Sequence, residues 1–123
     1  MKKDKATDAY DVGDNETALK EFRQLAEKGD AEAQFYLATL YNRGDDIVGG
    51  VEKVDFKEAF KWYRLSAEQG FAEAQYNLGV LHYHGRGVLQ DHEEAAKWWK
   101  LAAEQKLEVA QWNLEMMHGN SLN

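Results

Sequence analysis

Residues 67–91 read AEQGFAEAQYNLGVLHYHGRGVLQD, and the chain contains this stretch more than once. Residues 26–55 carry a longer version of it, and residues 103–119 carry a shortened one. The first two copies are offset by 41 positions and the last two by 36, because the segment between Gly44 and Asp55 holds five extra residues. A period of this size is typical of stacked-repeat architectures, in which each unit buries its apolar face against its neighbours.

Apolar residues recur with helical spacing, and the apolar runs lie between starting aspartates and closing glycines. Asp14, Asp55 and Asp91 are typical N-cap residues, and Gly29 and Gly70 suit the left-handed position that ends a helix. The pattern predicts one domain over residues 1–123 with about six main helices in antiparallel pairs, at approximately residues 14–28, 30–42, 55–69, 71–84, 91–105 and 107–118.

The ends of the chain and the extra loop residues depart from this pattern. Residues 5–12 are a weak helix candidate, and residues 44–55 are expected to form an exposed loop. Glu115 occupies the position of Ala38 and Gly79, and a carboxylate fits there only where no further helix packs against it. We therefore expect a complete short solenoid with polar ends, and a monomer.

Composition excludes several classes of function. The formal net charge of −7 argues against nucleic-acid binding, which rewards clustered lysine and arginine. The absence of cysteine excludes disulfides, thiolate zinc sites and thiol nucleophiles. No apolar segment is long enough for a secretion signal or a membrane span, so we expect a cytoplasmic protein as the chain stands, or an exported one if a signal peptide was removed.

The repeated motifs resemble a known family. The order AEQG, AEAQYNLG, GRGV and AAKWW, which recurs in register, is similar to the Sel-one-like repeat (SLR), a relative of the tetratricopeptide repeat. The resemblance covers about residues 14–118, with His82 where the family usually has the tyrosine seen at Tyr41, and Lys106 where Gly29 and Gly70 stand. It implies an all-α, right-handed solenoid of antiparallel helix pairs that acts as an adaptor for other proteins. Many bacterial relatives are exported.

In such a stack the first helix of each pair, the A helix, lines the concave surface. Its non-core positions are therefore expected to contact a protein or peptide partner, namely Tyr36, Thr39, Arg43, Asn77, Val80, His84, Trp112 and Asn113. Asparagine is a poor helix former, so Asn77 and Asn113 need an explanation. Their amides either face a partner's backbone or make structural hydrogen bonds, and the sequence leaves both alternatives open.

Tryptophan and histidine residues invite ligand-binding hypotheses, but packing explains them better. Helical spacing places the tryptophans in the core between repeats, except that Trp112 on the last helix is expected to be partly exposed. The histidines are interpreted as surface or packing residues, because His82 and His84 point to different sides of a helix and no cysteine assists them. No metal or cofactor is expected.

Two other functions compete with an interaction scaffold. Some relatives have been linked to β-lactam hydrolysis, so an envelope-associated hydrolase is an alternative. That chemistry needs a serine followed at +3 by lysine, and neither Ser66 nor Ser121 meets this requirement, so we expect no catalysis. The second alternative is a structural piece that only associates with itself.

Overall fold

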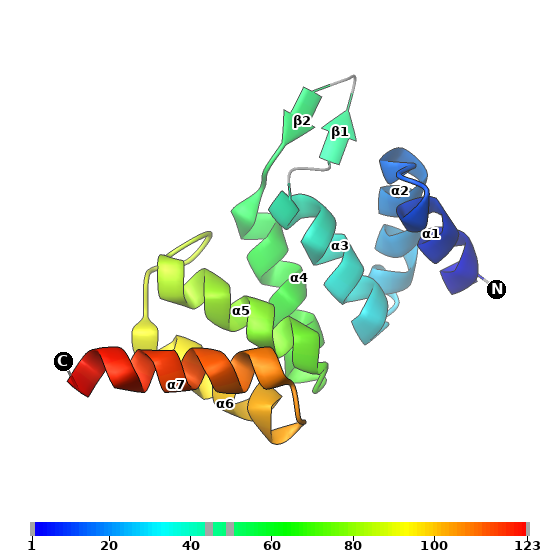
Figure 1. Ribbon diagram of the computed structural model, residues 1–123. Coiled ribbons are helices and arrows are strands. Elements are labelled where there is room, and N and C mark those ends of the chain that lie inside the picture. The colour runs from blue at the N-terminus through cyan, green and yellow to red at the C-terminus, as the bar shows by residue number, and fades with distance from the viewer. Residues whose placement is uncertain (1, 44–45, 49–50, 123) are drawn as a thin grey trace.

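The computed structural model describes residues 2–43, 46–48 and 51–122. From the N-terminus at the right of Figure 1 to the C-terminus at the left, the helices stack so that each one packs against the next. The helices are α1 (Lys2–Asp11), α2 (Asn15–Glu27), α3 (Ala31–Arg43), α4 (Phe56–Glu68), α5 (Ala72–His84), α6 (His92–Glu104) and α7 (Glu108–Leu122). The expected all-α solenoid of SLR type is confirmed.

The described residues form seven helices, one more than the six main helices that the pattern predicted. The additional helix is α1, which extends the weak candidate at residues 5–12 toward the N-terminus. Ala6 and Ala9 of α1 are buried, and the Tyr10 ring packs edge-on against Phe22 of α2 with centroids 6.2 Å apart. The apolar face of α1 consists of Ala6, Ala9 and Tyr10 alone among Lys2–Asp11, which is why its periodicity is weak in the sequence.

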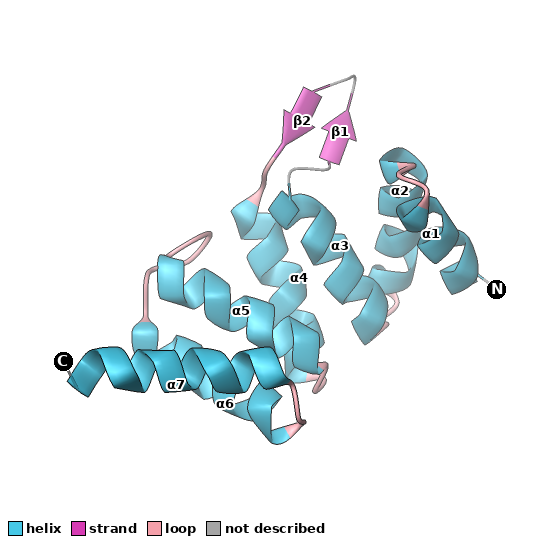
Figure 2. Cartoon of the chain, in the orientation of Figure 1, coloured by secondary structure: helices cyan, strands magenta, loops and turns pink. Residues whose placement is uncertain are grey.

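The expected loop between α3 and α4 contains a short β-hairpin. Strands β1 (Asp46–Val48) and β2 (Val51–Lys53) pair antiparallel, with Ile47 opposite Glu52. The hairpin, magenta in Figure 2, projects from the stack of helices. The β-branched residues of both strands favour extended backbone. The Gly49–Gly50 pair lies outside the described residues.

Aspartates begin the helices as their spacing predicted. The Oδ1 atoms of Asp14, Asp55 and Asp91 accept hydrogen bonds from backbone N–H groups three residues ahead, at 3.1–3.2 Å. Such a cap contributes about 1 kcal/mol to helix stability. Lys106 adopts a φ of 72°, in the left-handed region that glycine fills after α2 and α4.

Helices α5 and α6 approach each other closely at Gly79. The Trp99 indole of α6 lies over Gly79 and donates its Nε1–H to the Tyr76 carbonyl at 3.0 Å. A Cβ atom at Gly79 would lie 2.4 Å from Trp99 Nε1, so only glycine permits this approach. In the preceding repeat, Ala38 takes the equivalent position and is fully buried.

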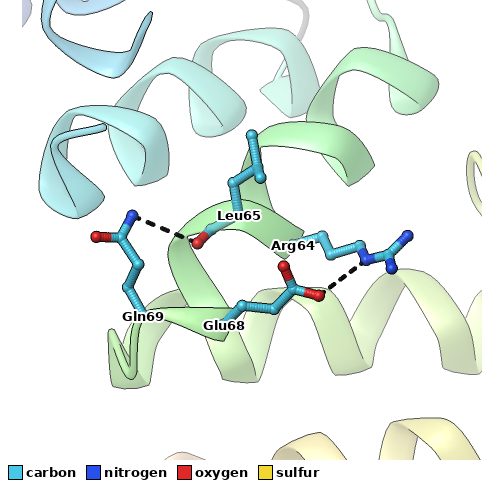
Figure 3. Close-up of polar contacts among 4 residues, drawn as sticks. All are labelled: Arg64, Leu65, Glu68 and Gln69. Atoms are coloured by element: carbon cyan, nitrogen blue, oxygen red, sulfur yellow. Dashed lines mark hydrogen bonds and ion pairs between the residues drawn. The ribbon is translucent and has the colours of Figure 1, made fainter. Parts of the chain in front are cut away.

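A series of hydrogen-bonded glutamines ties the repeats together, and two of them, Gln34 and Gln75, are buried. Gln34 donates to the Ala26 carbonyl at 3.1 Å and accepts from Gln69 at 2.8 Å. One repeat later, Gln75 donates to the Ala67 carbonyl at 3.2 Å and accepts from Gln105 at 3.0 Å. We call these four residues, Gln34, Gln69, Gln75 and Gln105, the glutamine ladder. Figure 3 shows that the Gln69 amide also reaches back to the Leu65 carbonyl of its own helix, 3.5 Å away.

Candidate partner-binding surface

Helices α1, α3, α5 and α7 occupy alternate places in the stack, and their side chains meet across it. The rings of Tyr10 in α1 and Tyr36 in α3 are 5.2 Å apart, edge to face. The Phe35 ring of α3 lies 5.2 Å from Phe71, the N-cap residue of α5. Asn113 of α7 donates to the Tyr76 hydroxyl of α5 at 3.3 Å. We call the surface formed by these four helices the A-helix face.

At the N-terminal end of this face, the predicted site residues make intramolecular contacts. Tyr36 stacks on Phe22 with centroids 4.9 Å apart and is half-buried. The Arg43 guanidinium donates to the Tyr10 hydroxyl and lies over its ring at 5.3 Å. A partner at this end of the face would compete with these contacts.

Acidic groups surround the Tyr36 hydroxyl. Burial raises the pKa of Tyr36, and the carboxylates of Glu32, Asp11 and Glu73 raise it further because they oppose a second negative charge. These carboxylates come from three different A helices. Three carboxylates of the A helices therefore act on Tyr36, at the end of the face where the Arg43 guanidinium also lies.

The middle of the face contains a hydrogen-bonded cluster around the Tyr63 hydroxyl. Burial raises the pKa of Tyr63, while side-chain hydrogen bonding with Thr39 and Asn77 lowers it. The Thr39 hydroxyl lies 2.9 Å from the Tyr63 hydroxyl and also donates to the Phe35 carbonyl at 3.0 Å. At the next repeat, the Asn113 amide donates to the Tyr76 hydroxyl at 3.3 Å, so Asn113 makes a contact between α7 and α5.

A hollow of about 260 Å³ lies between α5, α6 and α7. It brings together three of the predicted site residues, Val80, His84 and Asn113. Trp99, only 4% exposed, contributes its indole to the wall. Met116, at the position equivalent to Val80, also lines it, and the remaining lining residues, which sequence reasoning did not assign to a site, are Tyr76, Tyr83 and Met117.

An apolar stripe on α7 adjoins this hollow. Val109, Trp112 and Met116 are 43%, 59% and 47% exposed and lie on one side of the helix. The exposure of Trp112 confirms the expectation for the last helix. Met116 lines the hollow, while Val109 and Trp112 line a neighbouring depression together with Glu108 and Glu115. The sequence could have revealed this stripe, because Val109, Trp112 and Met116 follow helical spacing in the last helix of the repeats.

The serines and the possible metal ligands were the groups on which a hydrolase alternative depended. Ser66 is fully buried and donates to the Ala31 carbonyl at 2.7 Å, while the Ser121 side chain lies outside the described part. Among the described residues, no three histidine, aspartate or glutamate side chains converge as metal ligands. Within the same part of the chain, no helix combines the length and the apolar character needed to cross a membrane.

Comparison with family models shows which proteins share this arrangement. The model of the Sel1 repeat matches residues 31–71 and 72–107. The first match spans α3 and α4 with the segment between them, and the second spans α5 and α6. No relative is found among the curated proteins.

Solved structures similar to the chain include repeat proteins of several bacteria. A Sel1 repeat protein from Oxalobacter formigenes is 31% identical in sequence, with a TM-score of 0.85. The match covers 96% of this chain and 46% of the Oxalobacter protein. The protective antigen c5321 of uropathogenic Escherichia coli, which displays an SLR fold, is 38% identical with a TM-score of 0.74, over 84% of this chain and 21% of that one.

Cysteine rich protein B of Helicobacter pylori shares the fold at 21% identity and a TM-score of 0.70, over 80% of this chain and 71% of that one. The chain thus spans less than half the length of the Oxalobacter and Escherichia proteins.

Proposed function

Because the chain belongs to the Sel1 repeat family, we propose that it is a non-catalytic interaction module that binds a peptide or partner protein on its A-helix face. The Sel1 repeat fold is commonly a scaffold for protein–protein interactions. The observation that carries the proposal is the hollow between α5, α6 and α7, with an exposed tryptophan and methionine beside it. Exposed aromatic side chains next to a preformed hollow are typical of binding hot spots.

The binding region is the C-terminal part of the A-helix face. Here Val80, His84 and Met116 line the hollow, and Trp112 stands next to Met116 on the same helix. At the N-terminal part, Tyr36, Thr39 and Arg43 hold helices together, so their contribution to binding is to position the surface. The proposal assigns Asn77 and Asn113 the same positioning role.

The test maps where a partner docks. A photo-crosslinking amino acid is placed at position 84 or 116 on the A-helix face, or at Leu65 or Leu101, which are exposed on α4 and α6. The captured partner is then produced pure and its affinity measured by calorimetry. We expect cross-links from positions 84 and 116, and about tenfold weaker binding by Val80→Asp, because a carboxylate would replace an apolar side chain in the wall of the hollow.

Leu101→Ala is the matched control, since Leu101 is 43% exposed and lies on the opposite helix layer. It should leave the affinity unchanged. Cross-links that arise from positions 65 and 101 alone, together with a Val80→Asp variant of unchanged affinity, would place the binding surface on the B helices α2, α4 and α6 and would refute the proposal.

A further inference from the structure

We infer that the partner segment is basic and carries an apolar side chain that enters the hollow between α5 and α7, with lysine or arginine on either side of it. This inference rests on the proposed function, because it specifies the chemistry of the segment that the same surface would bind.

The apolar side chain of the inferred partner segment follows from the residues that line the hollow. The hollow offers an indole, two methionines and a valine, from Trp99, Met116, Met117 and Val80. Methionine is flexible and polarizable, so it adapts to differently shaped side chains. Trp112, at 59% exposure, is the largest apolar side chain next to the opening. A leucine, methionine or aromatic side chain would bury itself against this set.

The lysine or arginine residues of the inferred partner segment follow from the charges beside the hollow. Glu108 and Glu115 line the depression around Trp112. Neither this depression nor the hollow includes a lysine or arginine among its described lining residues. Further carboxylates, Glu32 and Glu73, lie on the N-terminal side of the A-helix face, close enough to raise the pKa of Tyr36. With a formal net charge of −7, the whole chain also attracts basic segments.

The same charges disfavour a second copy of the chain as the occupant. A two-fold contact through α7 would place the stripe Val109–Trp112–Met116 against itself. Glu108 and Glu115 of both copies would then surround one small apolar contact. Facing like charges at an interface oppose association, so a different, basic partner fits this surface better.

The test uses the full chain and three matched sets of short synthetic peptides. Each set carries the same leucine, methionine or tryptophan at its centre, flanked by lysine, by serine or by glutamate. Binding is measured by fluorescence polarisation at low and at physiological ionic strength. We expect the lysine set to bind about tenfold more tightly than the glutamate set, and its binding to weaken with added salt.

Variants connect this binding to the surface. Trp112→Ala should weaken binding of the lysine set about tenfold. The double change Glu108→Gln and Glu115→Gln should weaken that binding about threefold for each charge removed. Leu101→Ala, an exposed leucine of α6, and Glu27→Gln, an exposed carboxylate of α2, are the matched controls and should leave binding unchanged.

Equal binding of the lysine and glutamate sets, or equal effects of Trp112→Ala and Leu101→Ala, would overturn the inference. If the native partner nevertheless cross-links at positions 84 and 116, the proposed function stands and only the basic chemistry is wrong. If the partner cross-links from the opposite layer, both proposals fail.

Discussion

His82 shows how one residue changes a repeat. In the preceding repeat its position is held by Tyr41, whose hydroxyl accepts a hydrogen bond from the Arg23 guanidinium. His82 is 8% exposed, and its Nδ1 atom has no hydrogen-bond partner in the described part of the chain. Arg64, the equivalent of Arg23, instead pairs with Glu68 at 3.1 Å, as Figure 3 shows. A hollow of about 350 Å³ opens beside the smaller imidazole.

The buried imidazole makes stability depend on pH. Burial lowers the pKa of His82 below its usual 6.5, although the carboxylates of Glu94 and Asp91 oppose this shift. The unfolded chain therefore binds the proton more tightly than the folded chain does. The free energy of unfolding should decrease as the pH falls from 6.5 through the lowered pKa of the folded state.

We predict that His82→Tyr removes this loss of stability in acid. The phenol would fill the hollow as Tyr41 does, and its hydroxyl would accept from Arg64, which adds about 1 kcal/mol at neutral pH. Urea unfolding followed by circular dichroism, above and below the usual imidazole pKa, measures both effects. His84→Gln, a change at an exposed histidine, should keep the acid sensitivity of the parent chain. A His82→Tyr variant that is as acid-sensitive as the parent would contradict this account.

At the scale of helices, the glutamine ladder connects elements that apolar packing alone would leave free to slide. In each repeat, a buried glutamine of an A helix bonds the end of the preceding B helix and the glutamine at the end of the next B helix. Gln34 and Gln75 are 4% and 5% exposed, whereas Gln111, at the same position in the last repeat, is exposed and donates to Glu115 at 3.2 Å. The repeats therefore provide an internal comparison of one residue in two environments.

We predict that Gln75→Ala and Gln34→Ala each lower the free energy of unfolding by about 1–2 kcal/mol, because each change removes two hydrogen bonds, one to the carbonyl at the end of a B helix and one from the next glutamine of the ladder. Gln111→Ala should change it by less than about 0.5 kcal/mol, as expected for an exposed position. Chemical denaturation of the three variants measures the difference. Equal costs at positions 75 and 111 would show that helix propensity, and not the ladder, determines the effect.

Sequence reasoning succeeded where the repeat constrains each position and failed where it does not. Period, aspartate caps and closing glycines predicted the helix pairs, because these signals recur in register. The hairpin of β1 and β2 was missed, since it occurs once, in the insertion. The glutamine ladder was missed because glutamine is usually exposed, although its recurrence at 34 and 75 was visible.

The candidate site was predictable only in part, for a related reason. Helical periodicity identifies which positions avoid the core, and it correctly singled out Trp112. It does not identify contacts that come from another helix. Arg43 bonds Tyr10 of α1, a helix with a weak pattern, and the Trp99 indole reaches the hollow from α6.

At the scale of the whole molecule, a stack of repeats has two ends that differ from its middle. Helix α5 packs between α4 and α6 and has six buried residues. Helix α7 packs mainly on α6, and within residues 108–119 Ala110 alone is buried. In a one-dimensional stack, such a terminal element lacks the stabilisation that a second neighbour provides.

We predict that backbone amides of α7 exchange with solvent at least about tenfold faster than those of α5, because α7 opens without disturbing the other helices. Hydrogen–deuterium exchange with mass spectrometry measures this, and α3, which is covered on both sides like α5, is the control. If the chain is a monomer, as we propose, the difference persists at every protein concentration. Protection of α7 that rises with concentration, together with a larger species in size-exclusion chromatography, would show that another copy covers the stripe around Trp112. The acidic surface would then have to be neutralised in that assembly, and the assignment of a basic partner would lose its physical basis.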